Sequence, residues 1–296
     1  MQLTLKYIRD RLTGMQRGLL LSPPPGHFYS PIVDKADMRR RADQLFGPPA
    51  RTLPGLALNE AEQLALLGDF EAFYADIPFK NTKQAGLRYY YQNGFYCQSD
   101  GIFLYSMIRR FQPKRIIEIG SGFSSACMLD TLDSLGRSNV SITFIEPYPN
   151  RLKANMYPTD FARCTIIESD LQSVDARLFS TLKANDILFV DSTHVSKTGS
   201  DVNRIIFEIL SGLPSGVLVH FHDIFYPFEY PRDWVLNSKG FGWNEAYILR
   251  AFLSHNPDYE IIAFNTFLEE FHRPRFAANM PACLDNCGGS IWIRRK

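Results

Sequence analysis

The sequence of 296 residues predicts an α/β fold: a doubly wound, seven-stranded, mostly parallel sheet whose last strand is antiparallel, with a helical N-terminal extension. Two observations predict it. After residue 114, short β-branched apolar runs alternate with helical segments, the pattern of parallel strands joined by crossover helices. Before residue 85, proline-rich turns separate short helical patterns. We therefore expect an extension over residues 1–85 and a sheet domain over 86–296.

The elements are expected in the following order. Helices in the extension cover 2–12, 34–46 and 59–75, and the third begins after Asn59, with Glu62 at the spacing of a capping box. A helix over 99–110 leads into the sheet domain. Because no clear helical pattern separates the last two apolar runs, we expect them to pair antiparallel at one edge. The expected strands cover 115–119, 141–145, 165–167, 186–190, 216–221, 259–264 and 290–294.

Charge and composition exclude several classes of function. Lys and Arg number 32 against 31 Asp and Glu, and no run of like charge is longer than 39–41 or 294–296, which argues against a nucleic-acid or polybasic membrane surface. No stretch approaches the ~20 apolar residues of a bilayer span. The five cysteines, Cys283 and Cys287 among them, are odd in number and sparse, which favours free thiols. We expect a cytoplasmic protein acting on a small molecule, with no nucleic-acid or membrane partner; a homo-oligomer is left open.

The first strand runs into a glycine-containing turn. Gly120 and Gly122 allow the backbone to turn sharply and to approach a ligand that a Cβ would exclude. Ser125 stands where the dinucleotide fingerprint G-x-G-x-x-G needs its third glycine. This departure counts against a pyrophosphate-binding dehydrogenase.

An acidic residue follows each of the next two strands. Glu146 comes after the second strand, where a carboxylate can accept the hydrogen bonds of ribose hydroxyls. Asp170 follows the third strand and suits the amino group of an adenine. Either acid alone is commonly a solvated strand end, but a loop and two acids at three successive strand ends form an ordered set that predicts a nucleoside-containing cofactor.

With ExGSGxS after the first strand and these two acids, the chain over 86–296 resembles the class I S-adenosylmethionine-dependent methyltransferases. The resemblance implies the methyltransferase form of the Rossmann-like fold and S-adenosylmethionine as cofactor. It places Glu118 near the amino-acid end of the cofactor, Glu146 on the ribose and Asp170 near the adenine. The remaining residues implied beside the cofactor are Gly120, Ser121, Gly122, Phe123 and Asp191.

Polar residues also follow the fourth and fifth strands. Asp191 and His194 come after the fourth strand, and His222 and Asp223 end the fifth. If these strands are neighbours, about 4.8 Å apart, all four side chains converge at the rim that carries the glycine loop. Mixed carboxylate and imidazole groups are typical of a divalent-ion site. His220 lies deeper on the same strand face as His222 and is expected to be a core histidine.

The D-x-x-H pattern with the pair after strand five resembles the metal-dependent O-methyltransferases of the catechol and macrolide-sugar types. That resemblance implies Asp191, His222 and Asp223 as ligands of a divalent ion and His194 as the general base. His222 departs from the family, which carries an acid there. Because Mg²⁺ prefers oxygen, an imidazole shifts the expectation toward Mn²⁺, Fe²⁺ or another transition ion, or toward a vacant site. The expected reaction is O-methylation of a small hydroxylated acceptor, a sugar or a secondary metabolite.

Two alternatives use the same residues. Two histidines with one aspartate match the ligand set of non-haem iron oxygenases, which would make the protein a hydroxylase on this fold. A non-catalytic module that binds S-adenosylmethionine is the other. The segment Trp243-Asn244-Glu245 is expected only to start a helix.

Overall fold

The computed structural model describes residues 24–237 and 242–296. By compactness the chain divides into two units: a smaller one of Met1–Pro49 with Tyr230–Gly242, and a larger one of Ala50–Glu229 with Trp243–Lys296. The helix expected over 2–12 lies outside the described residues. The functional boundary expected at residue 85 stays a prediction, since the division by compactness falls at Pro49.

The described residues of the smaller unit form three short helices, α2 (Lys35–Arg40), α3 (Ala42–Leu45) and α9 (Arg232–Asn237). The carboxylate of Asp34 caps α2 by accepting the backbone N–H of Ala36 at 2.8 Å. The guanidinium of Arg39 donates to the carbonyl of Leu236 at 3.4 Å and so links α2 to α9. The helix expected over 34–46 is therefore present as two short helices.

The larger unit is built on a seven-stranded sheet in the order β3-β2-β1-β4-β5-β7-β6. Strands β1 to β5 are parallel, and β7 is antiparallel to both β5 and β6. The predicted fold class is thus confirmed. The strands are β1 (Arg115–Ile119), β2 (Ser141–Ile145), β3 (Cys164–Ile167), β4 (Ile187–Val190), β5 (Leu218–His222), β6 (Tyr259–Phe264) and β7 (Ser290–Arg295).

The connection between the last two strands differs from the expectation. They pair antiparallel as predicted, but two helices, α11 (Asn265–Phe271) and α12 (Arg273–Asn279), separate them. Strand β7 also inserts between β5 and β6, so β6 forms the edge. The helices were not predicted because α11 begins at Asn265, directly after the last residue of β6, with no turn residues between them to mark its start.

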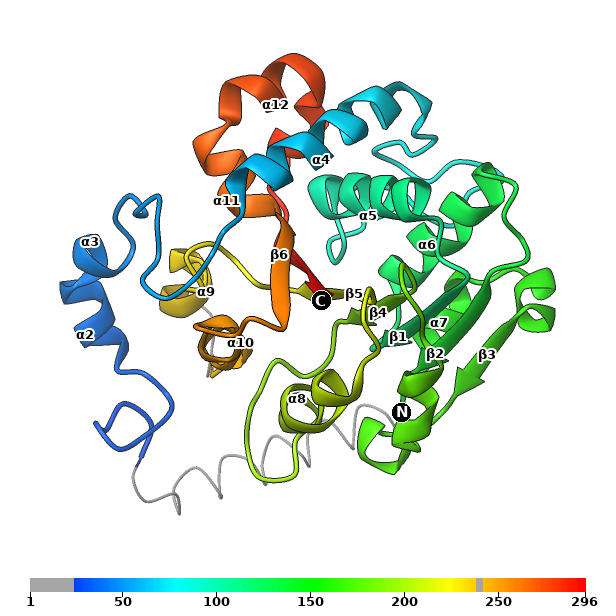
Figure 1. Cartoon of the computed structure of the whole chain (residues 1–296). Helices are drawn as coiled ribbons and strands as arrows, with labels where there is room; N and C mark the ends of the chain where they lie inside the picture. Colours follow the sequence, from blue (N-terminus) through cyan, green and yellow to red (C-terminus); the bar gives the residue numbers. More distant parts are fainter. Residues whose placement is uncertain (1–23, 238–241) are drawn as a thin grey trace, which may run out of the picture. The chain divides into compact units, whose positions relative to one another are not determined.

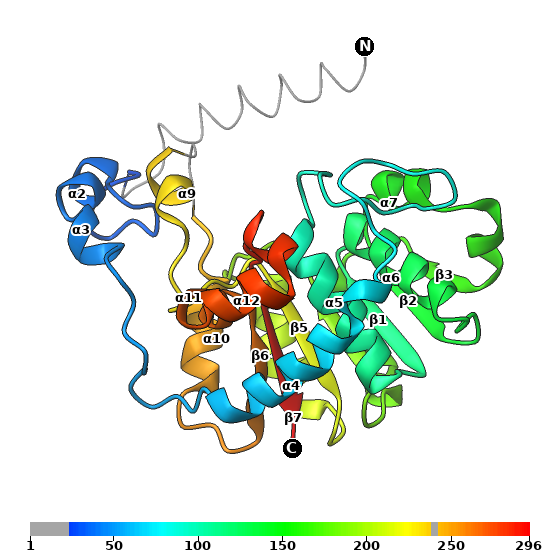
Figure 2. The same ribbon diagram turned by 90° about the horizontal axis from the view of Figure 1, so that it is seen from above.

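Helices cover both faces of the sheet. Figure 1 shows α4 (Glu60–Phe73), α5 (Gln98–Phe111) and α6 (Phe123–Ser134) on one side, with α8 (Asp201–Arg204) and α10 (Glu245–Leu253) on the other. Figure 2 shows α4, α5 and α12 lying across one face. Helix α7 (Asn150–Asn155) follows β2. Strands β4 and β5 are buried along their whole length and form the centre of the core.

Helix α4 begins where predicted but without its capping box. Asn59 adopts a left-handed conformation, and its side chain makes no cap hydrogen bond. Its amide instead donates to the carbonyl of Ile261 at 3.1 Å, which fastens the start of α4 to β6. A tertiary contact therefore replaces the local cap that the sequence suggested.

The expectations about thiols and membranes can also be compared with the structure. All five cysteines lie in the described residues and are free, as predicted. Within 24–237 and 242–296, no helix has the length and apolar character that crossing a bilayer requires.

Candidate active site

Two clefts open at the carboxyl ends of the parallel strands, within the larger unit. The first, which we name the carboxylate cleft, has a volume of about 360 Å³ and is lined by residues that include Glu146, Asp170 and Asp201. The second, the histidine cleft, has about 300 Å³ and is lined by residues that include His194, His222 and Trp243. Both clefts share Glu146 and Asp191. They therefore adjoin at the rim where the sequence placed the cofactor.

The turn after β1 needs a glycine at its first position. Gly120 has a φ of 77°, and a Cβ there would lie 1.7 Å from the carbonyl oxygen of Asp191. Gly122 has extended backbone with a φ of 179°, and a Cβ there would come within 3.2 Å of Cδ of Arg151, on a flexible side chain. The close approach of β1 to β4 thus explains Gly120 on its own, without a ligand.

Glu118 lies beneath this turn. Its side chain is fully buried, accepts a hydrogen bond from Ser124 Oγ at 2.5 Å and another from Ser125 Oγ, and lines neither cleft. Burial raises the pKa of Glu118 to about 8 against the opposing effect of both serines. The structure therefore gives Glu118 a supporting position under the loop, whereas the sequence placed it beside the cofactor.

Glu146 and Asp170 both line the carboxylate cleft. The two carboxylate oxygens of Glu146 accept the backbone N–H groups of Ser121 at 3.1 Å and Tyr148 at 2.8 Å. Asp170 caps a short 3₁₀ turn through the backbone N–H of Ser173 at 3.0 Å. Because an ionised carboxylate has about four acceptor positions, each acid retains capacity for a ligand.

The predicted chemical residues also converge. Ligand atoms of Asp191, His194 and Asp223 all lie within 4.8 Å of one another, at the ends of β4 and β5. His194 and Asp223 have φ values of 58° and 57°. Residues other than glycine rarely adopt this left-handed backbone conformation, and those that do concentrate at functional sites.

His194 is held from its outer side by a buried carboxylate. Its Nδ1 lies 2.9 Å from Glu245 Oε2, and its ring centroid lies 4.2 Å from that of Trp243. Its Nε2 faces the cleft, 3.3 Å from Asp191 Oδ1 and 3.6 Å from Asp223 Oδ2. When Nδ1–H donates its hydrogen bond to Glu245, Nε2 is the nitrogen that can exchange a proton with a ligand.

His222 meets the same two carboxylates from the other direction. Its Nδ1 lies 3.4 Å from Asp191 Oδ1 and 3.8 Å from Asp223 Oδ2, and its Nε2 lies 3.5 Å from Asp100 Oδ2. His220 is separate from this group: it is buried, stacks on Phe189 and bonds Ser290 at 3.0 Å. The expectation that His220 is a core histidine agrees with this position.

The four charged side chains shift one another's pKa. Burial alone would lower the pKa of His194, but bonds to Asp191 and Glu245 raise it to about 10. Burial likewise opposes charge at His222, yet Asp223 and Asp191 raise its pKa well above the usual value. The pKa of Asp191 is lowered despite burial, by His222 and His194, whereas burial raises the pKa of Asp223. These shifts favour the charged forms of both histidines and of Asp191, whereas the shift at Asp223 favours its neutral form.

Three residues of this site were not assigned from the sequence. Glu245 and Trp243 were expected only to start a helix, and Asp100 lies in the first turn of α5. Glu245 has no exposed surface. In the sequence, however, a buried glutamate at the start of a helix looks the same as a solvated one. Only the tertiary packing distinguishes the two.

Several buried polar atoms at the histidine cleft have no hydrogen-bond partner. Such atoms are uncommon in native proteins and call for an explanation, for example a missing ligand. The cleft is therefore suited to a polar ligand. The atoms, each on a residue that lines the cleft, are Tyr96 Oη, Ser121 Oγ, Ser192 Oγ and His222 Nδ1.

Comparison with known proteins agrees with this geometry. The family model described as a methyltransferase domain matches residues 117–224, a span from Glu118 through Asp223. A protein of Archaeoglobus fulgidus, described as uncharacterized, is 34% identical over 170 residues, which are 55% of this chain and 75% of that protein. The chain belongs to the class I S-adenosylmethionine-dependent methyltransferases.

Solved structures with related folds share little sequence with the chain. An S-adenosylhomocysteine-bound methyltransferase from Podospora anserina is 15% identical, with 89% of this chain and 97% of that chain covered and a TM-score of 0.42. The O-methyltransferase TomG from Streptomyces achromogenes, in complex with S-adenosylmethionine, is 14% identical, with 88% and 96% covered and a TM-score of 0.42.

Proposed function

We propose that this methyltransferase transfers the methyl group of S-adenosylmethionine to a hydroxyl group of a small acceptor in the histidine cleft. The observation that carries the proposal is the convergence of Asp191, His194 and Asp223 next to the glycine loop. The cofactor, when bound, supplies an electrophilic methyl group on a sulfonium sulfur. The residues of the chain then have to bind the two reactants in line and remove one proton.

The carboxylate cleft suits the nucleoside part of the cofactor. Glu146 has free acceptor positions for two ribose hydroxyls, and Asp170 has one oxygen beyond its cap. The unpartnered Oγ atoms of Ser121 and Ser192 lie where the two clefts adjoin and suit the polar amino-acid part. A cofactor that extended from the carboxylate cleft into the histidine cleft would pass Asp191, which lines both.

His194 is proposed as the general base. Glu245 fixes the ring so that Nε2 faces the cleft, which is the arrangement by which a carboxylate orients a catalytic histidine. As the acceptor oxygen bonds to the methyl carbon, His194 takes the hydroxyl proton at Nε2, and the carbon–sulfur bond breaks to leave S-adenosylhomocysteine. Nε2 must be unprotonated at that moment, and a cation beside Asp191 and Asp223 would favour that form by offsetting their negative charge.

A divalent ion at Asp191 and Asp223 would be such a cation, with His222 as a third ligand. The Nδ1 of His222 lies 3.4 Å from Asp191 Oδ1 and 3.8 Å from Asp223 Oδ2, although the compact cluster of possible ligand atoms contains His194 in its place. Two carboxylates with an imidazole fit Mn²⁺ or Fe²⁺ better than Mg²⁺. Such an ion lowers the pKa of a hydroxyl group that it binds. His194 also reaches these carboxylates, so the assignment of base and ligand needs a direct test.

The test measures S-adenosylhomocysteine formation with catechols, phenols and sugars, with Mn²⁺, Fe²⁺ or Mg²⁺, and with a chelator. We expect acceptor-dependent turnover that the chelator abolishes and Mn²⁺ restores, with a methyl ether detected by mass spectrometry. His222→Gln should lose Mn²⁺ affinity, whereas His194→Gln should keep most of it. Full activity in the chelator would leave a metal-free general-base methyltransferase and refute the ion.

A second candidate rests on the pairing of two imidazoles with Asp191. The set His194, His222 and Asp191 is that of non-haem iron oxygenases. Oxygen consumption that depends on Fe²⁺ and yields a hydroxylated product without methyl transfer would favour this function. The same assays carried out anaerobically separate the two, because methyl transfer needs no oxygen.

A further inference from the structure

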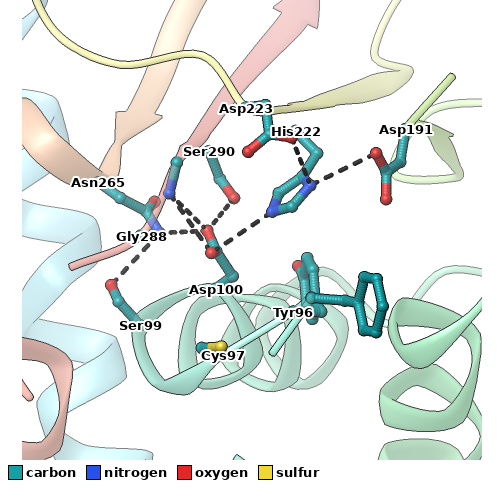
Figure 3. Close-up of polar contacts among 12 residues, drawn as sticks. Tyr96, Cys97, Ser99, Asp100, Asp191, His222, Asp223, Asn265, Gly288 and Ser290 are labelled. Carbon is teal, nitrogen blue, oxygen red and sulfur yellow. Dashed lines mark hydrogen bonds and ion pairs between the residues drawn. The ribbon is translucent and has the colours of Figure 1, made fainter. Parts of the chain in front are cut away.

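A buried carboxylate lies behind His222, on the side away from the two cleft aspartates. Asp100, in the first turn of α5, places Oδ2 at 3.5 Å from His222 Nε2. Figure 3 shows the imidazole between Asp100 and Asp191, with Asp223 above it; the dashed lines from Asp191 and Asp223 meet at one ring nitrogen, and the line from Asp100 ends at the other. Asp100 is 4% exposed and lines neither cleft, so its contact with the site runs through His222.

The carboxylate of Asp100 is fixed by the turn that leads into β7. The backbone N–H of Gly289 donates to Oδ1 at 3.1 Å, Ser290 Oγ donates to the same oxygen, and Asn265 Nδ2 lies 3.4 Å from it. A Cβ on Gly288 would lie 2.6 Å from Oδ1. The loop is thus shaped around this carboxylate. The N–H of Gly289 also reaches Oδ2, at 3.3 Å, and Oδ2 is the oxygen that faces His222.

The opposite nitrogen of His222 points into the site without a hydrogen-bond partner. Nδ1 is buried and lies between Asp191 and Asp223, and the ring packs 5.1 Å from the ring of Tyr96. A neutral imidazole has one N–H and one lone pair, and the bond made by one nitrogen decides which nitrogen carries the lone pair. A proton held at Nε2 by Asp100 leaves the lone pair on Nδ1.

We propose that Asp100 is a positioning residue that holds the Nε2 proton of His222 and so directs the Nδ1 lone pair to a divalent ion at Asp191 and Asp223. This inference rests on the proposed metal-assisted function. Carboxylates behind ligating histidines fix the ring orientation and the tautomer, and their loss commonly weakens metal affinity by about 10- to 100-fold. Asp100 would act here through His222 alone, because it reaches neither cleft.

The test compares Asp100→Asn with the whole wild-type chain by two readouts besides activity. Binding of Mn²⁺ is followed by calorimetry, and the protonated nitrogen of His222 by ¹⁵N–¹H correlation spectra of the chain with Zn²⁺ as a diamagnetic substitute. We expect Asp100→Asn to weaken Mn²⁺ binding about 10- to 100-fold and to disturb the Nε2-protonated form, with S-adenosylmethionine affinity changed less than twofold.

Glu269→Gln is the matched control. Glu269 is a buried carboxylate of the same polar cluster that bonds Ser99 and the N–H of Gly288 and has no contact with His222. We expect it to leave Mn²⁺ affinity and the His222 signal unchanged. An equal loss in Glu269→Gln, or an unchanged affinity and His222 signal in Asp100→Asn, overturns the proposal.

A second variant and a wild-type measurement cover the remaining outcomes. If Asp100→Asn does not fold, Ser290→Ala keeps the carboxylate but removes one of its supports, and we expect a smaller loss in the same direction. If the wild-type chain binds neither Mn²⁺ nor Zn²⁺, the metal part of the proposed function fails. The role of Asp100 toward the ion is then overturned with it, while methyl transfer itself is still measured by S-adenosylhomocysteine formation.

Discussion

The two clefts present carboxylates to ligands in opposite ways. In the carboxylate cleft, Asp170 is exposed and Glu146 is half-buried, and their carboxylate oxygens accept hydrogen bonds from backbone N–H groups. In the histidine cleft, Asp191 and Asp223 face two imidazoles, and each imidazole has a further carboxylate behind it. The first arrangement leaves acceptors free for neutral hydroxyl and amino donors, whereas the second holds buried carboxylates against imidazoles.

Under the proposed function, this difference separates cofactor binding from the chemical step. Removing an acid from the carboxylate cleft takes away hydrogen bonds from neutral donors to a carboxylate, which contribute about 1.5–3 kcal/mol each. Removing a charged member of the histidine cleft leaves its partners buried and uncompensated, with a larger penalty. Substitutions in the first cleft should therefore act on cofactor affinity, and substitutions in the second on turnover.

The largest effect is expected from His194→Gln. Glutamine keeps polar atoms near Glu245 but cannot take a proton, so kcat should fall by about 10²- to 10⁴-fold while the Kd for S-adenosylmethionine changes less than twofold. Stopped turnover assays and calorimetry measure the two quantities. His272→Gln is the control, because His272 pairs with Glu60 outside both clefts. If cofactor affinity falls as much as kcat, His194 is structural and the comparison fails.

The sequence predicted the parts of this site that depend on strand order. Once β1 to β5 are parallel, Glu146, Asp170, Asp191 and His222 must gather at one rim, because they follow strand ends. It could not place Glu245, which comes from a helix beyond an intervening segment and whose burial depends on how α10 packs. Nor could the sequence show the position of the Glu118 side chain. The apolar pattern predicts that Glu118 lies on a strand, but only the burial of its side chain shows that it supports the loop.

Glu118 supports the turn that both clefts share, and its effect should depend on pH. Its folded-state pKa of about 8 lies above the ordinary 4.5 of a glutamate, so the folded protein holds a proton that the unfolded chain releases. This contribution to stability is complete below about pH 4.5 and is lost as pH rises toward 8, by up to about 1.4 kcal/mol per pH unit.

Glu118→Gln should remove that dependence. Between pH 5 and pH 8 its free energy of unfolding, measured by urea denaturation, should fall less than that of the wild type, by roughly 2–4 kcal/mol. Only the difference between the two pH values is compared, so a uniform loss from imperfect packing cancels. Glu168→Gln serves as the control because Glu168 is exposed and pairs with Lys153. Parallel pH curves for Glu118→Gln and wild type would show that Glu118 is ionised in the fold.

Glu146→Ala should act on the cofactor and leave the chemical step intact. Loss of the ribose acceptors should raise the Kd for S-adenosylmethionine by about 5- to 150-fold, equivalent to about 1–3 kcal/mol, with kcat at saturating cofactor within threefold. Calorimetry and initial rates measure both. Glu168→Ala, one strand away and outside the cleft lining, should leave the Kd unchanged. An unchanged Kd in folded Glu146→Ala would remove the ribose assignment.

The smallest effect is expected at Asp170, where a structural role and a binding role share one side chain. Asparagine caps helical turns about as well as aspartate, so Asp170→Asn should keep the bond to Ser173 and the melting temperature. Its remaining amide presents donors to the adenine amino group, so the Kd should rise about three- to tenfold. Asp170→Ala should show that loss together with about 0.5–2 kcal/mol of stability. The purine-riboside analogue of S-adenosylhomocysteine, which carries hydrogen in place of the amino group, should bind wild type and Asp170→Asn alike. If Asp170→Asn weakens the analogue as much as the adenosine compound, Asp170 acts on the cleft through its charge. The contrast between acceptors for neutral donors in one cleft and paired charges in the other then no longer holds at this position.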